Sequence, residues 1–150
     1  MASTNMLLPM VIGALICGQA VVAPAQVAQV RHAILVHITR GPEDPTRAAL
    51  GFAVAKAAVD AGNSVSIFLA GDAVQLIREP VLSSLNGLGT GNLRELYDAI
   101  VAGGGKFYIS GGSSKARGVT EQDLAGKPAV FAGPPQLLQL SISHDRMFVY

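Results

Sequence analysis

The chain has 150 residues, and half of them are hydrophobic, which is enough to bury one domain core and excludes a disordered polar segment. Eleven lysines and arginines oppose ten aspartates and glutamates, and this near-neutral charge excludes the broad positive surface with which proteins bind nucleic acids. The single cysteine, Cys17, excludes an internal disulfide and any zinc or iron-sulfur site built from several cysteines.

The first thirty residues carry no charged side chain, whereas every charged residue lies at or beyond Arg31. The stretch MLLPMVIGALICGQAVVA, residues 6–23, is apolar, and Ala23-Pro24-Ala25 has the small-x-small pattern of a signal-peptidase site. We therefore predict that residues 1–25 are a signal peptide. The protein is then expected in the periplasm or secreted from the cell.

Two alternatives for this segment stay open. A retained membrane anchor needs about 20 apolar residues, and the stretch approaches that length, but Pro9, Gln19 and Pro24 interrupt it. A membrane partner is expected only if this leader is retained. Lipid attachment at Cys17 is disfavoured because Ile16 precedes the cysteine where that processing requires a small residue. Cleavage after residue 25 would leave a mature chain without cysteine.

Beyond the leader, short β-rich runs alternate with helical stretches, which is typical of βα units around a parallel sheet. The run HAILVHIT, residues 32–39, predicts a first strand that is buried on both faces. Asp44 and Pro45 are residue types that favour a helix N-cap and the first helical position. They predict a helix that runs to about residue 61 and ends at Gly62-Asn63.

A second strand is predicted at residues 64–70 (SVSIFLA), followed by Gly71-Asp72 and a short amphipathic helix. Residues 82–93 (LSSLNGLGTGNL) contain three glycines and two asparagines, so they are predicted as an irregular loop with the composition of a mobile flap. The spacing of apolar residues then predicts a helix at residues 93–102, which a glycine triplet ends.

A third strand is predicted at residues 106–110 (KFYIS), and the segment GGSSKARG, residues 111–118, is predicted as a loop. After it the pattern predicts, in chain order, a helical turn, a strand, a helix and a closing strand, at residues 120–125, 127–132, 133–143 and 146–150. These elements make one domain, residues 31–150, of the α/β class. The predicted architecture is a three-layer α/β/α fold with a mostly parallel five-stranded sheet.

Ligands of open parallel sheets bind at the carboxyl ends of the strands, where loops and helix N-termini expose backbone N–H groups. The loops after the first three strands should meet there, and the third combines glycines, hydroxyls and two cations. This composition fits anion binding, but it also fits an ordinary tight turn, and both interpretations stay open. The candidate ligand-binding residues are Ser110, Gly111, Gly112, Ser113, Ser114, Lys115, Arg117, Arg40 and Asp72.

No residue is assigned a catalytic role. Serine hydrolysis requires a serine, an imidazole and a carboxylate in contact, and the GxSxG elbow is missing. His37, amid apolar strand residues, is interpreted as a core histidine hydrogen-bonded to a neighbour, and His144 with Asp145 as groups at the end of the last helix. His32 and His37 are five residues apart on a strand and point to opposite faces, so we expect no metal and no other cofactor.

The order of HAILVHITRGPEDPTRAALGFAVAKAAVDAG, SVSIFLAGDAVQLI, GGGKFYISGGSSKARGVTEQDL and SHDRMFVY resembles the DsrE/DsrF-like family, which has the YchN-type α/β/α fold. The resemblance covers essentially everything after residue 31, and its most specific piece is FYISGGSSKARGVT. It implies a homo-oligomer, a trimer or a hexamer. Some members of the family relay sulfur as a cysteine persulfide.

The resemblance implies that a relay cysteine would stand at the end of the third strand or just after it. The matching stretch here, Ser110 to Ser114, has no thiol, and a serine hydroxyl cannot form a persulfide. The leading hypothesis is therefore an exported, non-catalytic homo-oligomer that binds a small anionic or sulfur-containing ligand. One alternative is a sulfurtransferase-type relay component that uses a partner's thiol or a retained Cys17, and another is a purely structural subunit.

Overall fold

A five-stranded sheet forms the centre of the fold, and each neighbouring pair of its strands runs parallel. The computed structural model describes residues 30–150, so the predicted signal peptide, the anchor alternative and Cys17 lie outside the described residues. The predicted three-layer α/β/α architecture is confirmed. In spatial order the strands are β6 (Ala129–Ala132), β5 (Lys106–Ser110), β2 (Ser64–Leu69), β1 (Ala33–Ile38) and β7 (Arg146–Val149).

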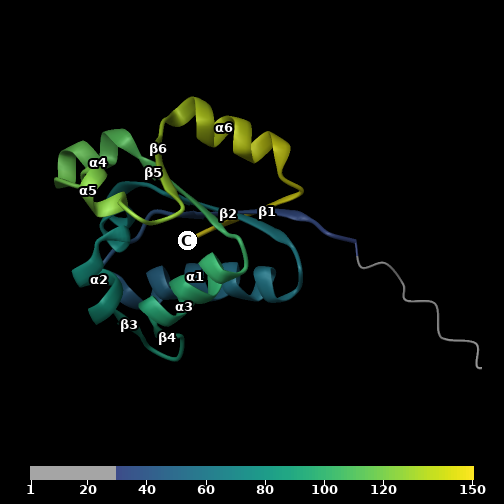
Figure 1. The fold of residues 1–150 in the computed structure, drawn as a ribbon, viewed down its shortest axis with the longest axis horizontal. Coiled ribbons are helices and arrows are strands. Elements are labelled where there is room, and N and C mark those ends of the chain that lie inside the picture. The colour runs from purple at the N-terminus through teal and green to yellow at the C-terminus, as the bar shows by residue number, and fades with distance from the viewer. Residues whose placement is uncertain (1–29) are drawn as a thin grey trace, which may run out of the picture.

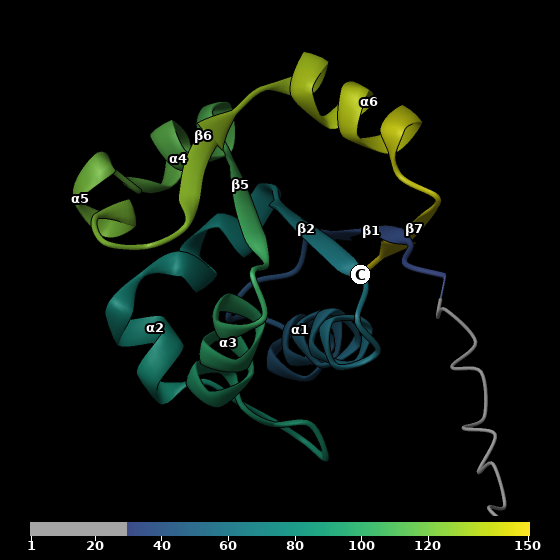
Figure 2. The same ribbon diagram turned by 45° about the vertical axis from the view of Figure 1, so that its right-hand side comes forward.

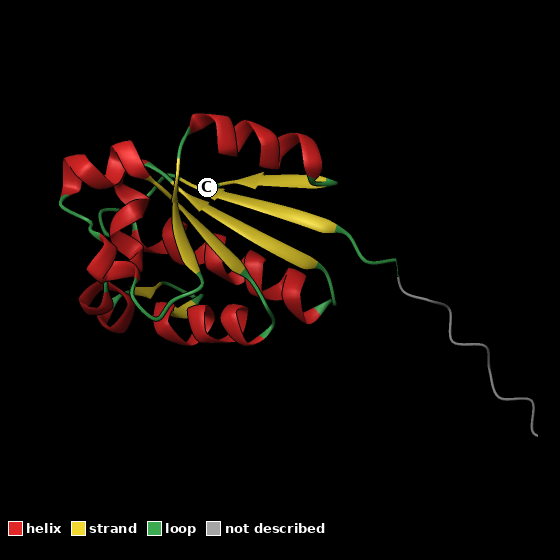
Figure 3. Ribbon diagram, turned by 45° about the horizontal axis from the view of Figure 1, so that its top comes forward, coloured by secondary structure: helices red, strands yellow, loops and turns green. Residues whose placement is uncertain are grey.

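Helices cover the two faces of the sheet unequally. Figure 1 shows α6 (Pro134–Ser143) on one side of the sheet and both α1 (Pro45–Asp60) and α3 (Leu93–Ala102) on the other. Four shorter helices gather at the end towards which the strand arrows point (Figure 3). They are the 3₁₀ helix η1 (Gly71–Ile77), α2 (Glu79–Ser84), α4 (Gly111–Arg117) and α5 (Glu121–Leu124).

The face under α1 and α3 holds the main core. Successive strand residues point to opposite faces, and on this face Val36, Ile67 and Phe107 are buried almost completely. Three aromatic rings pack there, because Phe107 lies 5.9 Å from Phe52 and 5.0 Å from Tyr97 between ring centroids. Burial also raises the pKa of Tyr97 to about 12, so its phenol stays neutral.

The opposite face has a smaller core, because α6 is the helix that covers it (Figure 2). Leu35 and Phe68 of the sheet pack there against Leu140 of α6. Met147 and Val149 of the edge strand β7 stand in register with Leu35 and His37 on this face, and they are 40% and 61% exposed. This side of the molecule therefore presents an apolar surface that the described residues do not cover.

Helix α1 begins as the sequence predicts. The Asp44 side chain accepts a hydrogen bond from the backbone N–H of Arg47, and Pro45 is the first helical residue. Helix α3 confirms its predicted apolar face, since Leu93, Tyr97 and Ile100 are buried. In both helices, therefore, local sequence signals and core packing agree.

The expectation of an irregular loop at residues 82–93 is wrong in part. Helix α2 continues to Ser84 because Leu82 is buried and the Ser84 hydroxyl donates to the Pro80 carbonyl at 2.7 Å. A small antiparallel hairpin follows, made of β3 (Asn86–Gly87) and β4 (Gly91–Asn92). Within residues 30–150 no helix is both long and apolar enough to cross a membrane.

Candidate functional site

The expectation of a loop at residues 111–118 is wrong, because Gly111–Arg117 forms helix α4. Ser110 caps its first turn by accepting a hydrogen bond from the Ser113 N–H at 3.5 Å. Gly118 ends the helix in the left-handed conformation, with φ of 66°. These two end signals, together with packing on η1, outweigh the weak helix propensity of a segment that begins with two glycines.

One face of α4 is fastened to η1, the helix that follows β2. The Nε of Arg117 donates to Oδ1 of Asp72 at 2.7 Å, and the backbone N–H of Gly71 donates to the Ser113 hydroxyl at 3.0 Å. Three predicted ligand-binding side chains, Asp72, Ser113 and Arg117, are thus brought together. Their polar atoms bond within the protein, and this cluster joins the ends of β2 and β5.

A second face of α4 lines an open groove, which we call the α4 groove. Its volume is about 490 Å³, and it lies between α4, the segment after α4 and the side of β6. Helix α4 contributes Gly111, Ser114 and Lys115 to the lining. The remaining lining residues are Gly118, Val119, Thr120 and Phe131.

Two polar side chains of α4 are unpaired in this groove. Ser114 is only 2% exposed, and its hydroxyl has no hydrogen-bond partner among residues 30–150. Lys115 is exposed and makes no hydrogen bond or ion pair with any described residue. An unpaired hydroxyl and an unpaired ammonium group on residues that line one groove are an arrangement that can receive an anion.

The other two predicted site residues lie elsewhere. Gly112 is an exposed residue of α4 that is not part of the groove lining. Arg40 follows β1, which β2 and β5 separate from β6 in the sheet. The residues predicted as one site are therefore arranged as the Asp72–Arg117 cluster, the α4 groove and an outlying Arg40.

The wall of the groove at residues 118–120 is held by polar contacts to Arg78, which follows η1, and to α5. Arg78 donates to the Gly118 carbonyl at 3.4 Å and lies 3.5 Å from Asp123 Oδ1. The backbone N–H of Thr120 donates to Asp123 at 2.8 Å, and this bond, with help from Arg78, lowers the pKa of the Asp123 carboxyl. These contacts hold residues 118–120 in place.

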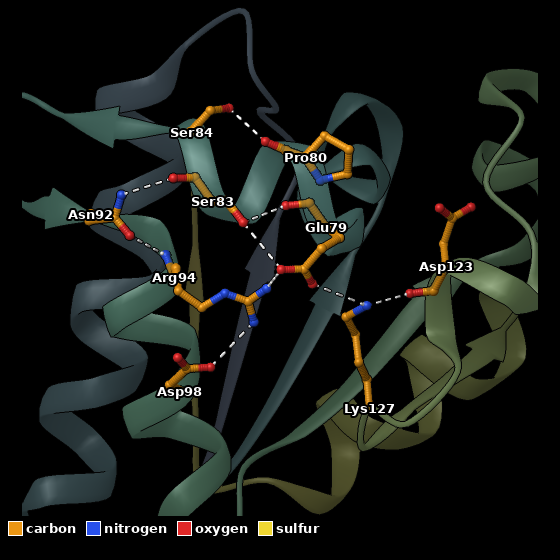
Figure 4. Close-up of polar contacts among 9 residues, drawn as sticks. All are labelled: Glu79, Pro80, Ser83, Ser84, Asn92, Arg94, Asp98, Asp123 and Lys127. Atoms are coloured by element: carbon orange, nitrogen blue, oxygen red, sulfur yellow. Dashed lines mark hydrogen bonds and ion pairs between the residues drawn. The ribbon is translucent and has the colours of Figure 1, made fainter.

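Figure 4 shows a second network that ties the same region to α2 and α3. Lys127 donates to the Asp123 carbonyl at 2.8 Å and lies 3.9 Å from Glu79 Oε2. Arg94 forms ion pairs with Glu79 and with Asp98, the latter at 3.4 Å. The sequence did not predict this network. Only the pair Arg94 and Asp98, four apart on a helix, carried a signal that could have revealed it.

His37 is half-buried, and the expected hydrogen bond is missing at its Nε2 atom, which is buried and has no partner within residues 30–150. The expectation is wrong for this nitrogen because its neighbours are apolar. The ring meets Phe68 edge-on, with centroids 5.7 Å apart, and Val149 stands beside it in register. Burial lowers the pKa of His37, so the imidazole is neutral at neutral pH.

The pKa of His37 predicts a pH dependence of stability. Because the folded-state pKa lies below the ordinary 6.5, the unfolded chain binds the proton first as the pH falls. The stability that the neutral His37 ring contributes is fully present above pH 6.5. It is lost as the pH falls towards the lowered folded-state pKa of His37. Urea denaturation at about pH 7.5 and about pH 5.5 should show a smaller pH effect for His37→Leu than for the natural chain. An equal pH effect in the two proteins would contradict this assignment.

His144 sits at the end of α6, as predicted. Its Nδ1 lies 2.7 Å from the Leu140 carbonyl, so it carries the proton and donates, and Nε2 then accepts from the Ser66 hydroxyl at 3.0 Å. Asp145 instead accepts from the Ala33 N–H at 2.8 Å, and this bond lowers the pKa of its carboxyl. The imidazole is oriented by a carbonyl rather than a carboxylate, which is not a hydrolase triad. Within residues 30–150, no three metal-ligating side chains cluster.

The Asp72–Arg117 pair is expected to show energetic coupling. Both side chains are partly exposed, at 46% and 29%, so each single variant, Asp72→Asn or Arg117→Met, should lower the free energy of unfolding by about 0.5–1 kcal/mol. The double variant should lose less than the sum of the two, as measured by urea denaturation. Additive losses would contradict the coupling. Arg47→Met serves as the control, because its pair with Asp44 is longer, at 3.7 Å, and more exposed at the arginine.

Comparison with known proteins gives one family and two similar folds. The sequence model of the DsrE/DsrF-like family matches residues 32–150. The crystal structure of the ychN protein from E. coli has a TM-score of 0.59 and 16% identity over 81% of this chain and 100% of that one. A conserved protein of unknown function from Bacteroides thetaiotaomicron, BT1422, has a TM-score of 0.56 and 13% identity over 79% and 95%. At these identities the likeness concerns the fold alone. No curated protein matches the chain.

Proposed function

This chain belongs to the DsrE/DsrF-like family, and we propose that it is a non-catalytic member that binds a small anion in the α4 groove instead of relaying sulfur. We propose further that it is exported and that it acts as a homo-oligomer. The fold is that of a family associated with sulfur relay, whereas the side chains at the end of β5 support binding.

The observation that carries this proposal is the chemistry at the junction of β5 and α4. The family match spans residues 32–150, and this span contains no cysteine. Where the sequence resemblance places a relay thiol, Ser110 caps α4 and Ser113 accepts from Gly71. These hydroxyls serve to hold the helix, and a hydroxyl cannot form a persulfide.

Anion binding is supported by the groove beside this junction. Lys115 supplies a positive charge that no described carboxylate neutralises, and Ser114 supplies a hydroxyl without a partner. Calorimetric titration of the full mature chain with sulfite, thiosulfate and simple carboxylates tests this part. Lys115→Gln should weaken the binding of any anion that binds. If no anion gives a heat of binding, or if the heat of binding is unchanged in Lys115→Gln, the proposal of anion binding in this groove is overturned.

Absence of sulfur relay needs its own test. The purified protein, incubated with a persulfide-bearing donor protein, should gain no sulfur atom in its intact mass. A gain that disappears after thiol reduction would support the alternative in which a retained Cys17 carries the sulfur, since Cys17 is the only thiol of the chain. The same measurement on protein from the native host reports leader cleavage, since a mature chain that starts at Gln26 has lost Cys17.

Self-association is supported by apolar side chains exposed on α6 and β7. Leu138 and Ile142 are 60% and 76% exposed four residues apart on α6, and Met147 and Val149 follow on β7. A trimer or a hexamer would remove such a surface from water. Light scattering should show Ile142→Glu with a lower mass than the natural chain. Leu88→Glu is the control, because Leu88 is 86% exposed on the distant β3–β4 hairpin. A monomeric natural chain at micromolar concentration would overturn the proposal.

A further inference from the structure

We infer that the α4 groove selects an organic monoanion with an apolar body, such as an alkyl carboxylate or an alkyl sulfonate, over an inorganic sulfur oxyanion. This inference rests on the proposed function, because it names the class of ligand for the same groove. It follows from three properties of the lining, which are the number of free charges, the polarity of the walls and the size of the space.

The lining offers one free positive charge. Two other cations lie near the groove, Arg117 on the same helix and Arg78 at the Gly118 carbonyl, but Arg117 is paired with Asp72 and Arg78 with Asp123. Only Lys115 among the described lining residues remains unpaired. A single ammonium group balances a monoanion, whereas a divalent oxyanion would keep an uncompensated charge after losing part of its hydration.

The walls of the groove are mostly apolar. Val119 is 5% exposed, and the ring of Phe131 packs partly against the main core. Gly111 and Gly118 add backbone without side chains, and the Thr120 hydroxyl lies 3.4 Å from the Asp123 carboxylate, to which it donates. Among the side chains of the lining, the polar groups without a partner are thus the Ser114 hydroxyl and the Lys115 ammonium group. The lining can thus bind the anionic head of a ligand at one place and the apolar body of the ligand along the rest of the groove.

The size of the groove agrees with this division. A volume of about 490 Å³ lies in the range of pockets that hold organic molecules, and a four-atom oxyanion would fill a small part of it. A ligand that places its head at Lys115 and its chain against Val119 and Phe131 would use both the charge and the apolar wall. The Ser114 hydroxyl would donate its otherwise unused hydrogen bond to that head.

The test is a calorimetric series of alkyl sulfonates, with sulfite, thiosulfate and the matching neutral alcohols, at constant ionic strength. Affinity should rise about fourfold for each added methylene until the groove is filled, because each buried CH₂ contributes a roughly constant free energy. Lys115→Gln should weaken sulfonate binding about tenfold and leave the alcohols unchanged. Lys106→Gln is the matched control, because Lys106 is a free surface lysine at the opposite end of β5.

Two variants, Ser114→Ala and Gly111→Leu, test separately how the groove binds the anionic head and the alkyl chain of the ligand. Ser114→Ala should weaken all anions alike, while Gly111→Leu should reduce the gain per methylene, because it places a side chain in the groove. A Cβ at residue 111 meets only the Ala132 carbonyl oxygen, at 3.8 Å, so its backbone tolerates the change. A thermal melt of each variant confirms that the fold is retained.

The outcomes distinguish this inference from the proposal it rests on. Inorganic anions that bind through Lys115, with no gain from a longer chain, would overturn the inference and leave anion binding intact. Binding of no anion would overturn both. Sulfonate binding that ignores Lys115→Gln but is lost in Ile142→Glu would place the ligand on the exposed stripe of α6 and would also overturn the inference.

Discussion

Phe107→Ala is expected to lower the free energy of unfolding by about 3–5 kcal/mol, the typical loss for removing a buried aromatic ring. Phe107 is 1% exposed and contacts the rings of Phe52 and Tyr97, so the deleted ring leaves a cavity between α1, α3 and the sheet. Its backbone N–H also donates to the Pro128 carbonyl at 2.9 Å, just before β6 begins. Loosening of β5 should therefore reach the edge strand β6 and the groove beside it.

Urea denaturation measures the effect of Phe107→Ala. The control is Leu88→Ala, which should change the free energy of unfolding by less than about 0.5 kcal/mol because Leu88 is 86% exposed. A loss below about 1 kcal/mol for Phe107→Ala would mean that the three rings do not form the centre of the core.

Gly41→Ala is expected to destabilise the protein by about 1–3 kcal/mol, because the added methyl group has no space. A Cβ at residue 41 would lie 2.3 Å from the carbonyl oxygen of Asp72 and 2.6 Å from its carbonyl carbon. Both are backbone atoms, so the loop after β1 or the start of η1 must move. The movement should also weaken the coupling between Asp72 and Arg117.

Thermal melts and the Asp72–Arg117 double-mutant cycle, repeated in the Gly41→Ala background, measure both effects. Gly112→Ala is the matched control, because a Cβ there meets no atom within 4 Å and the residue lies within helix α4. It should leave stability unchanged or raise it by up to about 1 kcal/mol. Equal stability of Gly41→Ala and the natural chain would show that the loop adapts without strain.

The elements of the fold were predictable wherever one local signal dominated. Asp44 and Pro45 begin a helix by satisfying or removing backbone N–H groups, whatever the rest of the chain does. Near-continuous apolar runs marked strands between two helical layers, because both of their faces must be buried. Helix α4 was missed because two glycines followed by two serines suggest a turn, although Ser110 and Gly118 are good end signals.

The candidate site was predictable in residue type but not in arrangement. Parallel strands bring the loops after β2 and β5 to one edge, and this placed Asp72 near residues 113–117. Whether Arg117 faces Asp72 or a ligand depends on the rotation of α4 about its axis, which its packing on η1 decides. The network of Glu79, Arg94 and Lys127 comes from separate segments, and no local pattern relates them.

By itself the sequence determined the class of fold, the order of the five sheet strands along the chain and the lack of a thiol after residue 17, because these depend on local periodicity and on composition. Only the tertiary structure decided which cations are free. Arg117 and Arg78 are neutralised by carboxylates from other segments, and Lys115 has no carboxylate partner among the described residues. The reason is physical: the electrostatic environment of a side chain depends on distances through space, which the order of residues does not contain.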